Sequence, residues 1–86
     1  MSYSIRIKRS AAKQLHRLST NDRRRLVAAI DRLATEPLAG SVLKGEFSGL
    51  RRLRVGQYRI IYEALPRELT VLVVRVGRRG SVYRAG

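Results

Sequence analysis

Basic side chains crowd one short stretch of the sequence, RRLRVGQYRIIY at residues 51–62. The stretch predicts a β-hairpin, because alternating runs flank the Gly-Gln pair at 56–57, and glycine first in a two-residue loop suits the twist of the strands. Counting outward from the turn places Arg54 opposite Arg59 on one face of the sheet, with Arg52 next along on that face. Like charges directly opposite each other destabilise a sheet. A bound anion would compensate them, and the planar fork of arginine suits a phosphate, so the chemistry we expect here is phosphate recognition.

The opposite face of the same hairpin is apolar. On it the same count pairs Val55 with Tyr58, Leu53 with Ile60 and Arg51 with Tyr62. Because residues two apart in a strand share a face, we interpret both tyrosines as core residues that point toward the helices. One face of the hairpin therefore belongs to the core, and the other is open to a ligand.

The whole chain is strongly basic. Its 86 residues include 19 Lys or Arg and six Asp or Glu, which gives a formal net charge of +13. Such a charge favours a polyanionic partner, either a nucleic acid or an acidic protein. The length predicts a single domain over residues 1–86. With no Cys and one His, His16, the chain offers neither a disulfide nor a zinc site, and we expect no metal and no cofactor.

The N-terminal stretch MSYSIRIKRS lacks the apolar core of a signal peptide. No apolar run in the sequence approaches the ~20 residues of a membrane span. We therefore expect a cytoplasmic protein without a membrane partner.

The basic face needs a scaffold, and the sequence predicts an α+β one. Residues 3–8 alternate as a short strand, and Ser10 can cap a helix that runs to about Leu18. Either Ser19 or Thr20 can cap a second helix, so that the two form a helical hairpin.

The second helix is predicted over about residues 21–34. Its apolar residues fall on one stripe that we expect to face a sheet: Leu26, Val27, Ile30, Leu33 and Ala34. Its polar face carries a run of arginines at 23–25, which are most simply explained as solvated side chains.

The rest of the chain is predicted to be β-structure. Pro37 and Gly40 open a loop to about Leu43, and the hairpin strands cover about residues 50–55 and 58–64. The stretch LTVLVVRV at 69–76 is apolar on both faces for most of its length, which is typical of the interior of a sheet. The predicted fold is thus an N-terminal strand, a helical hairpin and a three-stranded antiparallel meander, with the helices packed on one face of the sheet.

Several segments in this order carry a resemblance: YSIRIKRSAAKQLHRL, LKG, RRLRVGQYRIIYE, LTVLVVRVGRR and SVYR. Together they resemble the RelE/ParE superfamily of bacterial toxins from type II toxin-antitoxin systems. In the RelE branch the resemblance implies a ribosome-dependent endoribonuclease that cuts messenger RNA in the decoding site. In the ParE branch it implies inhibition of DNA gyrase, and because the fold is shared, the fold alone does not decide between them.

In the RelE branch, the resemblance assigns catalytic roles to four positions of this sequence. Arg59 matches the arginine that stabilises the transition state, and Arg79 matches a second catalytic arginine. Tyr83 matches the tyrosine that stacks on a base and serves as a possible general base. Arg52 lies on the strand where that branch places residues that assist acid–base chemistry.

The same resemblance implies a set of substrate-binding residues. Arg54 orients the phosphate, and Lys44 supports it from just before the basic strand. Arg51 is an alternative to Arg52, because the register of the basic strand is ambiguous by one residue. Arg78 stands where many relatives carry histidine, which leaves a cation but removes a group for acid–base chemistry.

Partners follow from charge and resemblance together. A domain of charge +13 is expected to bind an acidic, RelB-like antitoxin that folds on contact and forms a toxin–antitoxin hetero-oligomer with it. The RelE branch adds the 70S ribosome and messenger RNA as partners. A gyrase inhibitor and a basic RNA-binding protein without toxicity remain as alternative functions.

Overall fold

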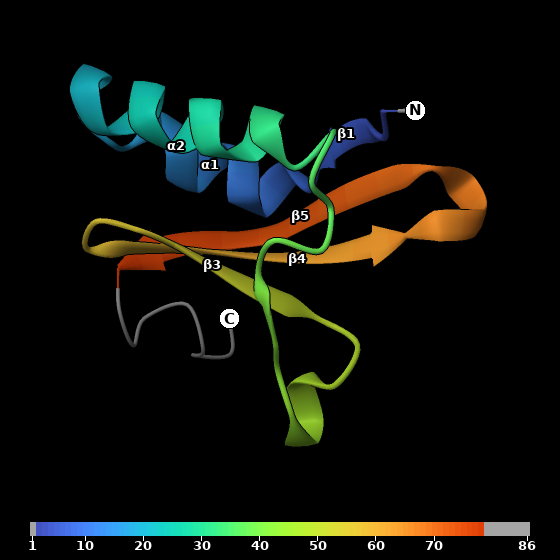
Figure 1. The fold of residues 1–86 in the computed structure, drawn as a ribbon. Helices are drawn as coiled ribbons and strands as arrows, with labels where there is room; N and C mark the ends of the chain where they lie inside the picture. The colour runs from blue at the N-terminus through green and yellow to red at the C-terminus, as the bar shows by residue number, and fades with distance from the viewer. Residues whose placement is uncertain (1, 79–86) are drawn as a thin grey trace.

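The computed structural model describes residues 2–78, in which a mixed sheet is covered on one face by helices (Figure 1). In chain order the elements are β1 (Ser4–Ile7), α1 (Arg9–His16), α2 (Thr20–Arg32), β2 (Ser41–Val42), the 3-10 turn η1 (Gly45–Phe47), β3 (Arg51–Val55), β4 (Tyr58–Leu65), the 3-10 turn η2 (Pro66–Glu68) and β5 (Thr70–Arg78). The strands are ordered β1-β5-β4-β3-β2, with β1 parallel to β5 and the other neighbours antiparallel. This arrangement confirms the predicted α+β fold. None of the described helices has the length and apolar character needed to cross a membrane.

The hairpin of β3 and β4 has the predicted register. Arg54 lies opposite Arg59, and the other pairs of the two strands also fall as counted from the sequence. Gly56 has a φ of 60°, which a residue with a side chain rarely adopts, and this conformation closes the two-residue turn. Because the turn sets the register, it also decides which side chains of both strands face the helices.

The first helix begins earlier than predicted. Ser10 was expected to be its cap, but this residue lies inside α1, and Lys8 is the N-cap with no side-chain hydrogen bond. The Lys8 N–H donates to the Val73 carbonyl at 2.9 Å, and the Lys8 carbonyl accepts from the Ala12 N–H at 2.9 Å. The chain therefore passes directly from strand pairing with β5 into the helix, and no capping side chain is required.

The second helix has one of the two predicted caps. The Ser19 hydroxyl accepts a hydrogen bond from the Asp22 N–H at 3.3 Å, so Ser19 and not Thr20 is the N-cap. The predicted apolar stripe needs one correction. Leu26 and Ile30 are buried, whereas Val27 is 40% exposed, because α2 turns this position away from the sheet.

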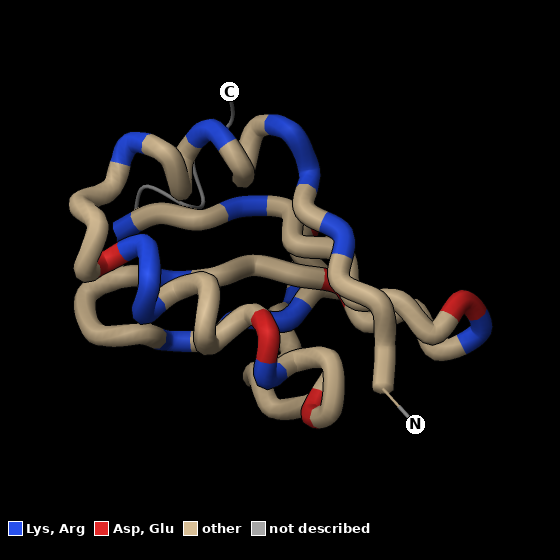
Figure 2. Tube along the Cα trace, turned by 90° about the horizontal axis from the view of Figure 1, so that it is seen from above, with Lys and Arg blue, Asp and Glu red and all other residues tan. Residues whose placement is uncertain are grey.

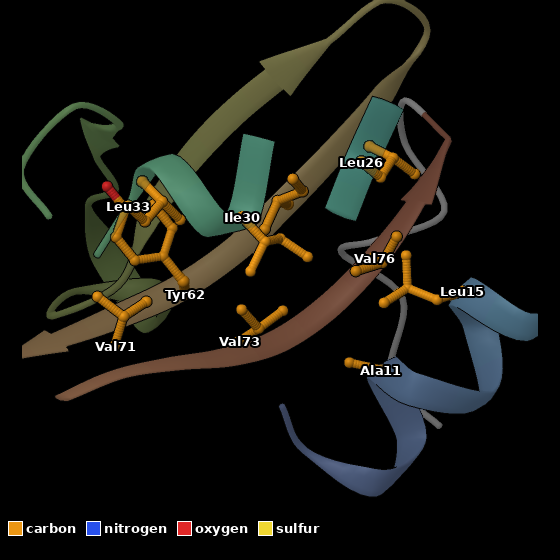
Figure 3. Packing of buried hydrophobic residues seen from close by; sticks show 10 residues of the cluster. Ala11, Leu15, Leu26, Ile30, Leu33, Tyr62, Val71, Val73 and Val76 are labelled. Atoms are coloured by element: carbon orange, nitrogen blue, oxygen red, sulfur yellow. The ribbon is translucent and has the colours of Figure 1, made fainter. Parts of the chain in front are cut away.

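The core lies between the helices and the face of the sheet that they cover (Figure 3). Leu26 and Ile30 of α2, with its C-cap residue Leu33, pack over Tyr62 and the β5 valines, and α1 adds Ala11 and Leu15 at one end. Tyr62 is fully buried, which confirms that it belongs to the core. Tyr58 is half-buried and packs against the same cluster.

Two features of the sheet were not predicted. The loop expected to end near Leu43 contains β2, whose Ser41 and Val42 pair with the first two residues of β3. A bulge also interrupts the pairing of β4 with β5, since Ile61 lies opposite Arg75 but Tyr62 lies opposite Val73. The extra residue lets both Val73 and Val76 face the core while Arg75 shares the open face with Ile61.

Tyr62 ties the loop between α2 and β2 to the sheet. Its hydroxyl donates to the Pro37 carbonyl at 2.8 Å and accepts from the Gly40 N–H at 2.9 Å. Arg51 donates to the Gly40 carbonyl at 2.8 Å. A Cβ on Gly40 would lie 2.7 Å from the Arg52 carbonyl oxygen, so only glycine fits this close approach.

Tyr62→Phe is expected to lower the free energy of unfolding by about 1–3 kcal/mol, because it leaves both backbone groups of the loop without the hydroxyl. Burial raises the pKa of Tyr62, partly opposed by the Gly40 hydrogen bond and the Arg51 charge. Since the native state then holds the proton more tightly than the unfolded chain, stability is full below the ordinary pKa of 10.0 and falls as the pH rises above it.

Urea unfolding of both proteins across the alkaline range tests this expectation, and the fall should be smaller in Tyr62→Phe. The matched control is Tyr3→Phe, on a half-buried tyrosine before β1 at the far edge of the sheet. Equal losses in the two variants would contradict the assigned role of Tyr62.

Candidate functional site

The open face of the sheet carries two rows of side chains across β3, β4 and β5. Arg54, Arg59 and Gly77 form the row nearest the hairpin turn. Arg52, Ile61 and Arg75 form the next row. Beside the turn two arginines face each other directly and the third position is a glycine, whereas in the next row Ile61 separates the two arginines.

A hollow of about 380 Å³ lies at this end of the sheet, and we call it the arginine hollow. It is lined by Arg54, Gly56, Gln57, Arg59 and Arg78. Its lining among the described residues thus carries three guanidinium groups and no carboxylate. Such a surface is suited to a phosphate group, which can accept from several guanidinium groups at once.

Arg59 differs from its neighbour in burial. It is 8% exposed, whereas Arg54 across the hairpin is exposed to solvent. Charges act more strongly where water is excluded, and a buried side chain keeps a fixed position. Within the hollow, Arg59 therefore offers the fixed charge and Arg54 the more mobile one.

Arg78 reaches the hollow from the last described position of β5. It lies opposite Tyr58, and its Cζ atom lies 5.9 Å from the centre of that ring. The sequence resemblance assigned Arg78 to substrate binding, and the structure places it with Arg54 and Arg59 at one hollow.

The other site residues expected from the sequence lie elsewhere. Arg52 is on the same face as Arg54 but in the second row. Arg51 lies on the helix-facing side opposite Tyr62, where it holds Gly40, and Lys44 is exposed before η1. Neither Arg51 nor Lys44 lines the arginine hollow.

Arg79 and Tyr83, which the resemblance assigned to catalysis, lie outside the described residues. The structure therefore provides neither their distance from the hollow nor their orientation. Their roles remain predictions from the resemblance.

The two core tyrosines are poorly suited to take a proton. The Tyr58 hydroxyl donates to Asp22 Oδ2 at 2.9 Å, and both hydrogen bonds of the Tyr62 hydroxyl go to backbone groups. Burial also raises the pKa of Tyr62, which disfavours the phenolate. His16 is exposed at the end of α1. Between residues 2 and 78, the site therefore supplies charge for anion binding and electrostatic stabilisation.

Arg75 is a basic residue of this face that the sequence did not reveal. The bulge in β5 places it opposite Ile61, on the face that carries Arg52. A strand that is apolar on both faces gives no periodic signal for a bulge, so the facing of Arg75 could not be read from the pattern.

No metal centre was found in the part of the chain that the structure describes. Residues 2–78 contain no cluster of three or more His, Cys, Asp or Glu side chains that could hold an ion.

Comparisons with known proteins place this architecture among toxins. The family model described as the ParE toxin of the type II toxin-antitoxin system parDE matches residues 5–83. Toxin RelG of Mycobacterium tuberculosis is 34% identical over 90 residues, which span 98% of this chain and 99% of the relative.

Solved structures agree with the sequence match. The toxin–antitoxin complex RelBE2 from Mycobacterium tuberculosis has a TM-score of 0.86 at 31% identity, with 92% of this chain and 93% of that chain covered. The archaeal RelE–RelB complex from Pyrococcus horikoshii has a TM-score of 0.77 at 30% identity, with coverage of 93% and 98%.

Arg54→Ala is expected to relieve repulsion in the hollow and to weaken anion binding. At low salt, the free energy of unfolding should stay unchanged or rise by about 0.2–1 kcal/mol, because the like-charge pair with Arg59 is removed. Added inorganic phosphate should raise the unfolding temperature of the wild type more than that of the variant.

Thermal unfolding at increasing phosphate concentration measures both effects. The matched control is Arg67→Ala in η2, at the opposite end of β4 from the hairpin turn. An Arg54→Ala protein that is destabilised and responds to phosphate like the wild type would contradict the anion site.

Proposed function

We propose that this chain, which belongs to the ParE toxin family of type II toxin-antitoxin systems, cleaves messenger RNA on the ribosome. The observation that supports this most is the arginine hollow, where Arg54, Arg59 and Arg78 line one space at the end of the sheet. Such action requires a cytoplasmic protein whose partners are the 70S ribosome and its message.

The proposed chemistry is attack of an RNA 2′-hydroxyl on the neighbouring phosphate, which closes a 2′,3′-cyclic phosphate. The bond from phosphorus to the 5′-oxygen breaks, and the leaving 5′-oxygen takes up a proton from water. This step concentrates negative charge on the phosphoryl oxygens, and preorganised donors that meet this charge lower the barrier. Arg59 is the best placed for this role, because it is both buried and part of the hollow. Arg54 on β3 and Arg78 on β5 then orient the phosphate from the strands on either side of β4, and Arg52 supports them from the second row.

Proton transfer is assigned to residues beyond the described part of the chain. Under the proposal, Tyr83 stacks on a base and accepts the proton of the attacking hydroxyl, and Arg79 adds a second catalytic charge. A phenol with the ordinary tyrosine pKa of about 10 is a poor general base, although nearby guanidinium groups favour the phenolate. The protein therefore depends on the ribosome to hold the RNA in the reactive geometry, and it cuts free RNA poorly.

One observation favours a second candidate function. The family model that matches this chain is the ParE toxin of parDE systems. The resemblance to the ParE branch implies inhibition of DNA gyrase. In that case the arginine hollow would be a surface that contacts gyrase, and the protein would not be a nuclease. A supercoiling assay distinguishes the two functions.

The third part of the proposal is an acidic antitoxin as partner. The structures of relatives are complexes of a toxin with its antitoxin. In this chain a groove of about 470 Å³ runs between α2 and β3, with largely apolar walls. Its charged lining residues are three arginines and one carboxylate: Arg25, Arg32, Arg54 and Glu36. β2 covers only the first two residues of β3, so no described strand lies beside the rest of that edge.

The distribution of basic residues along the chain suits such a partner (Figure 2). Lys and Arg residues recur along both helices and the sheet, and Asp and Glu residues are few, so an acidic segment gains charge neutralisation as well as apolar burial. Arg54 lines both the groove and the arginine hollow. A carboxylate bound in the groove therefore draws Arg54 away from the phosphate, which links antitoxin binding to inhibition in a toxin–antitoxin hetero-oligomer.

Wild-type protein is expected to produce codon-registered cuts in a message under translation in vitro, detected by primer extension. Arg59→Ala should lower the cleavage rate by about 10²–10³-fold, as is typical for loss of one donor to a developing oxyanion. Tyr83→Phe tests the proposed base, and Arg67→Ala is the matched surface control.

An intact message at doses that stop growth would contradict the nuclease, and loss of gyrase supercoiling activity at those doses would support the second candidate. RNA binding without any growth arrest would instead indicate a non-toxic RNA-binding protein.

Ala28→Glu is expected to weaken binding of the acidic antitoxin by about tenfold, because it adds a like charge to the wall of the groove. Ala28 is exposed on α2, so the substitution should leave the fold intact. The matched control is Asn21→Glu, which adds the same charge on the same helix but outside the groove. Titration calorimetry measures both affinities, and equal affinities would contradict the groove as the docking surface.

A further inference from the structure

Tyr58 and Arg78 lie side by side at the end of the sheet. The register pairs them across β4 and β5, and the Arg78 Cζ atom lies 5.9 Å from the ring centre. This distance is within the ~6 Å reach of a cation–π interaction. Tyr58 is half-buried and packs against the core, whereas Arg78 is exposed. The ring is therefore the fixed member of the pair, and the guanidinium group is the one whose position it can restrict.

The ring is in turn fixed by the start of α2. The Tyr58 hydroxyl donates to Asp22 Oδ2 at 2.9 Å. Asp22 belongs to the first turn of the helix, and its N–H donates to the Ser19 hydroxyl at 3.3 Å. A carboxylate in this position also gains from the positive end of the helix dipole. The orientation of the ring thus depends on the capped start of α2.

Arg78 stands between two hollows. One is the arginine hollow, which it lines together with Arg54 and Arg59. The other, of about 460 Å³, lies between the turn that joins the two helices and the end of β5, and Arg17 and Arg78 are its basic residues. A long side chain at a strand end has many rotamers, and it loses conformational entropy when a ligand orders it. A ring beneath the guanidinium group reduces that loss before any ligand binds.

We propose that Tyr58 and Asp22 are positioning residues for Arg78, which they hold at the rim of the arginine hollow so that it contacts the phosphate of bound RNA. The identity of the ligand rests on the proposed function. Tyr58 acts through its ring, because Asp22 holds its hydroxyl. Neither residue lines the arginine hollow.

The experiment measures binding of a 2′-O-methyl RNA oligonucleotide to the isolated protein, since blocking the attacking hydroxyl separates binding from cleavage. Arg78→Ala should weaken binding by about tenfold, as expected for loss of a charge-assisted hydrogen bond. Tyr58→Leu, which removes the ring, should reproduce most of this loss. The double variant should bind no more weakly than Arg78→Ala to within about twofold, because the two substitutions remove the same contact.

Conservative variants separate positioning from general destabilisation. Tyr58→Phe keeps the ring and loses only the hydrogen bond to Asp22, so it should retain most of the affinity that Tyr58→Leu loses. Asp22→Asn should have the same small effect, and combining it with Tyr58→Phe should add little. The matched control is Tyr3→Leu, which removes a half-buried ring at the far edge of the sheet and should lower the unfolding temperature without changing RNA affinity.

Losses that add in the Tyr58→Leu and Arg78→Ala double variant would overturn the proposal, as would an affinity unchanged by Arg78→Ala. The binding test and the message-cleavage test can fail independently of each other. If the wild type cuts no message while the two substitutions remain coupled in oligonucleotide binding, the nuclease fails and the positioning role stands. If the wild type cuts its message and the losses add, the positioning role fails alone.

Discussion

The register of one hairpin determines both the core and the candidate site. A turn of two residues with Gly56 at positive φ fixes the pairing of β3 with β4, and a slip by one residue would move the side chains of one strand to the opposite face relative to its partner. In the observed register Tyr62 enters the core while Arg59 faces outward next to Arg54. Apolar burial on one face thus holds together like charges that would otherwise separate on the other.

That repulsion is the physical basis of the proposed activity. A protein of net charge +13 already resists compaction, and a pair of facing arginines adds to the cost. The cost is offset by the buried core between the sheet and the helices, and a phosphate in the hollow would remove much of it. The same charges explain why an acidic partner suits the toxin, since Arg54 is shared between the hollow and the groove beside α2.

Local signals in the sequence were sufficient for the hairpin and for the helical layer. Alternation and a turn glycine gave the pairing of Arg54 with Arg59, and apolar spacing gave most of the stripe on α2. The strand β2 was missed because two residues have no periodicity, and its position depends on the distant Tyr62 hydroxyl. The facing of Arg75 depends on a bulge in a strand that is apolar on both sides, and the shared hollow of Arg78 depends on how two strand ends meet. These features arise from tertiary contacts, which a single sequence does not display.

The central claim is that Arg54, Arg59 and Arg78 share one RNA phosphate. The most direct measurement is NMR of the arginine side-chain Nε–Hε groups during titration with a short, uncleavable RNA. The account predicts that these resonances move together with a single dissociation constant, while those of Arg6 and Arg67 move little. Resonances that shift with different dissociation constants, or larger shifts along the helices than at the hairpin end, would contradict it.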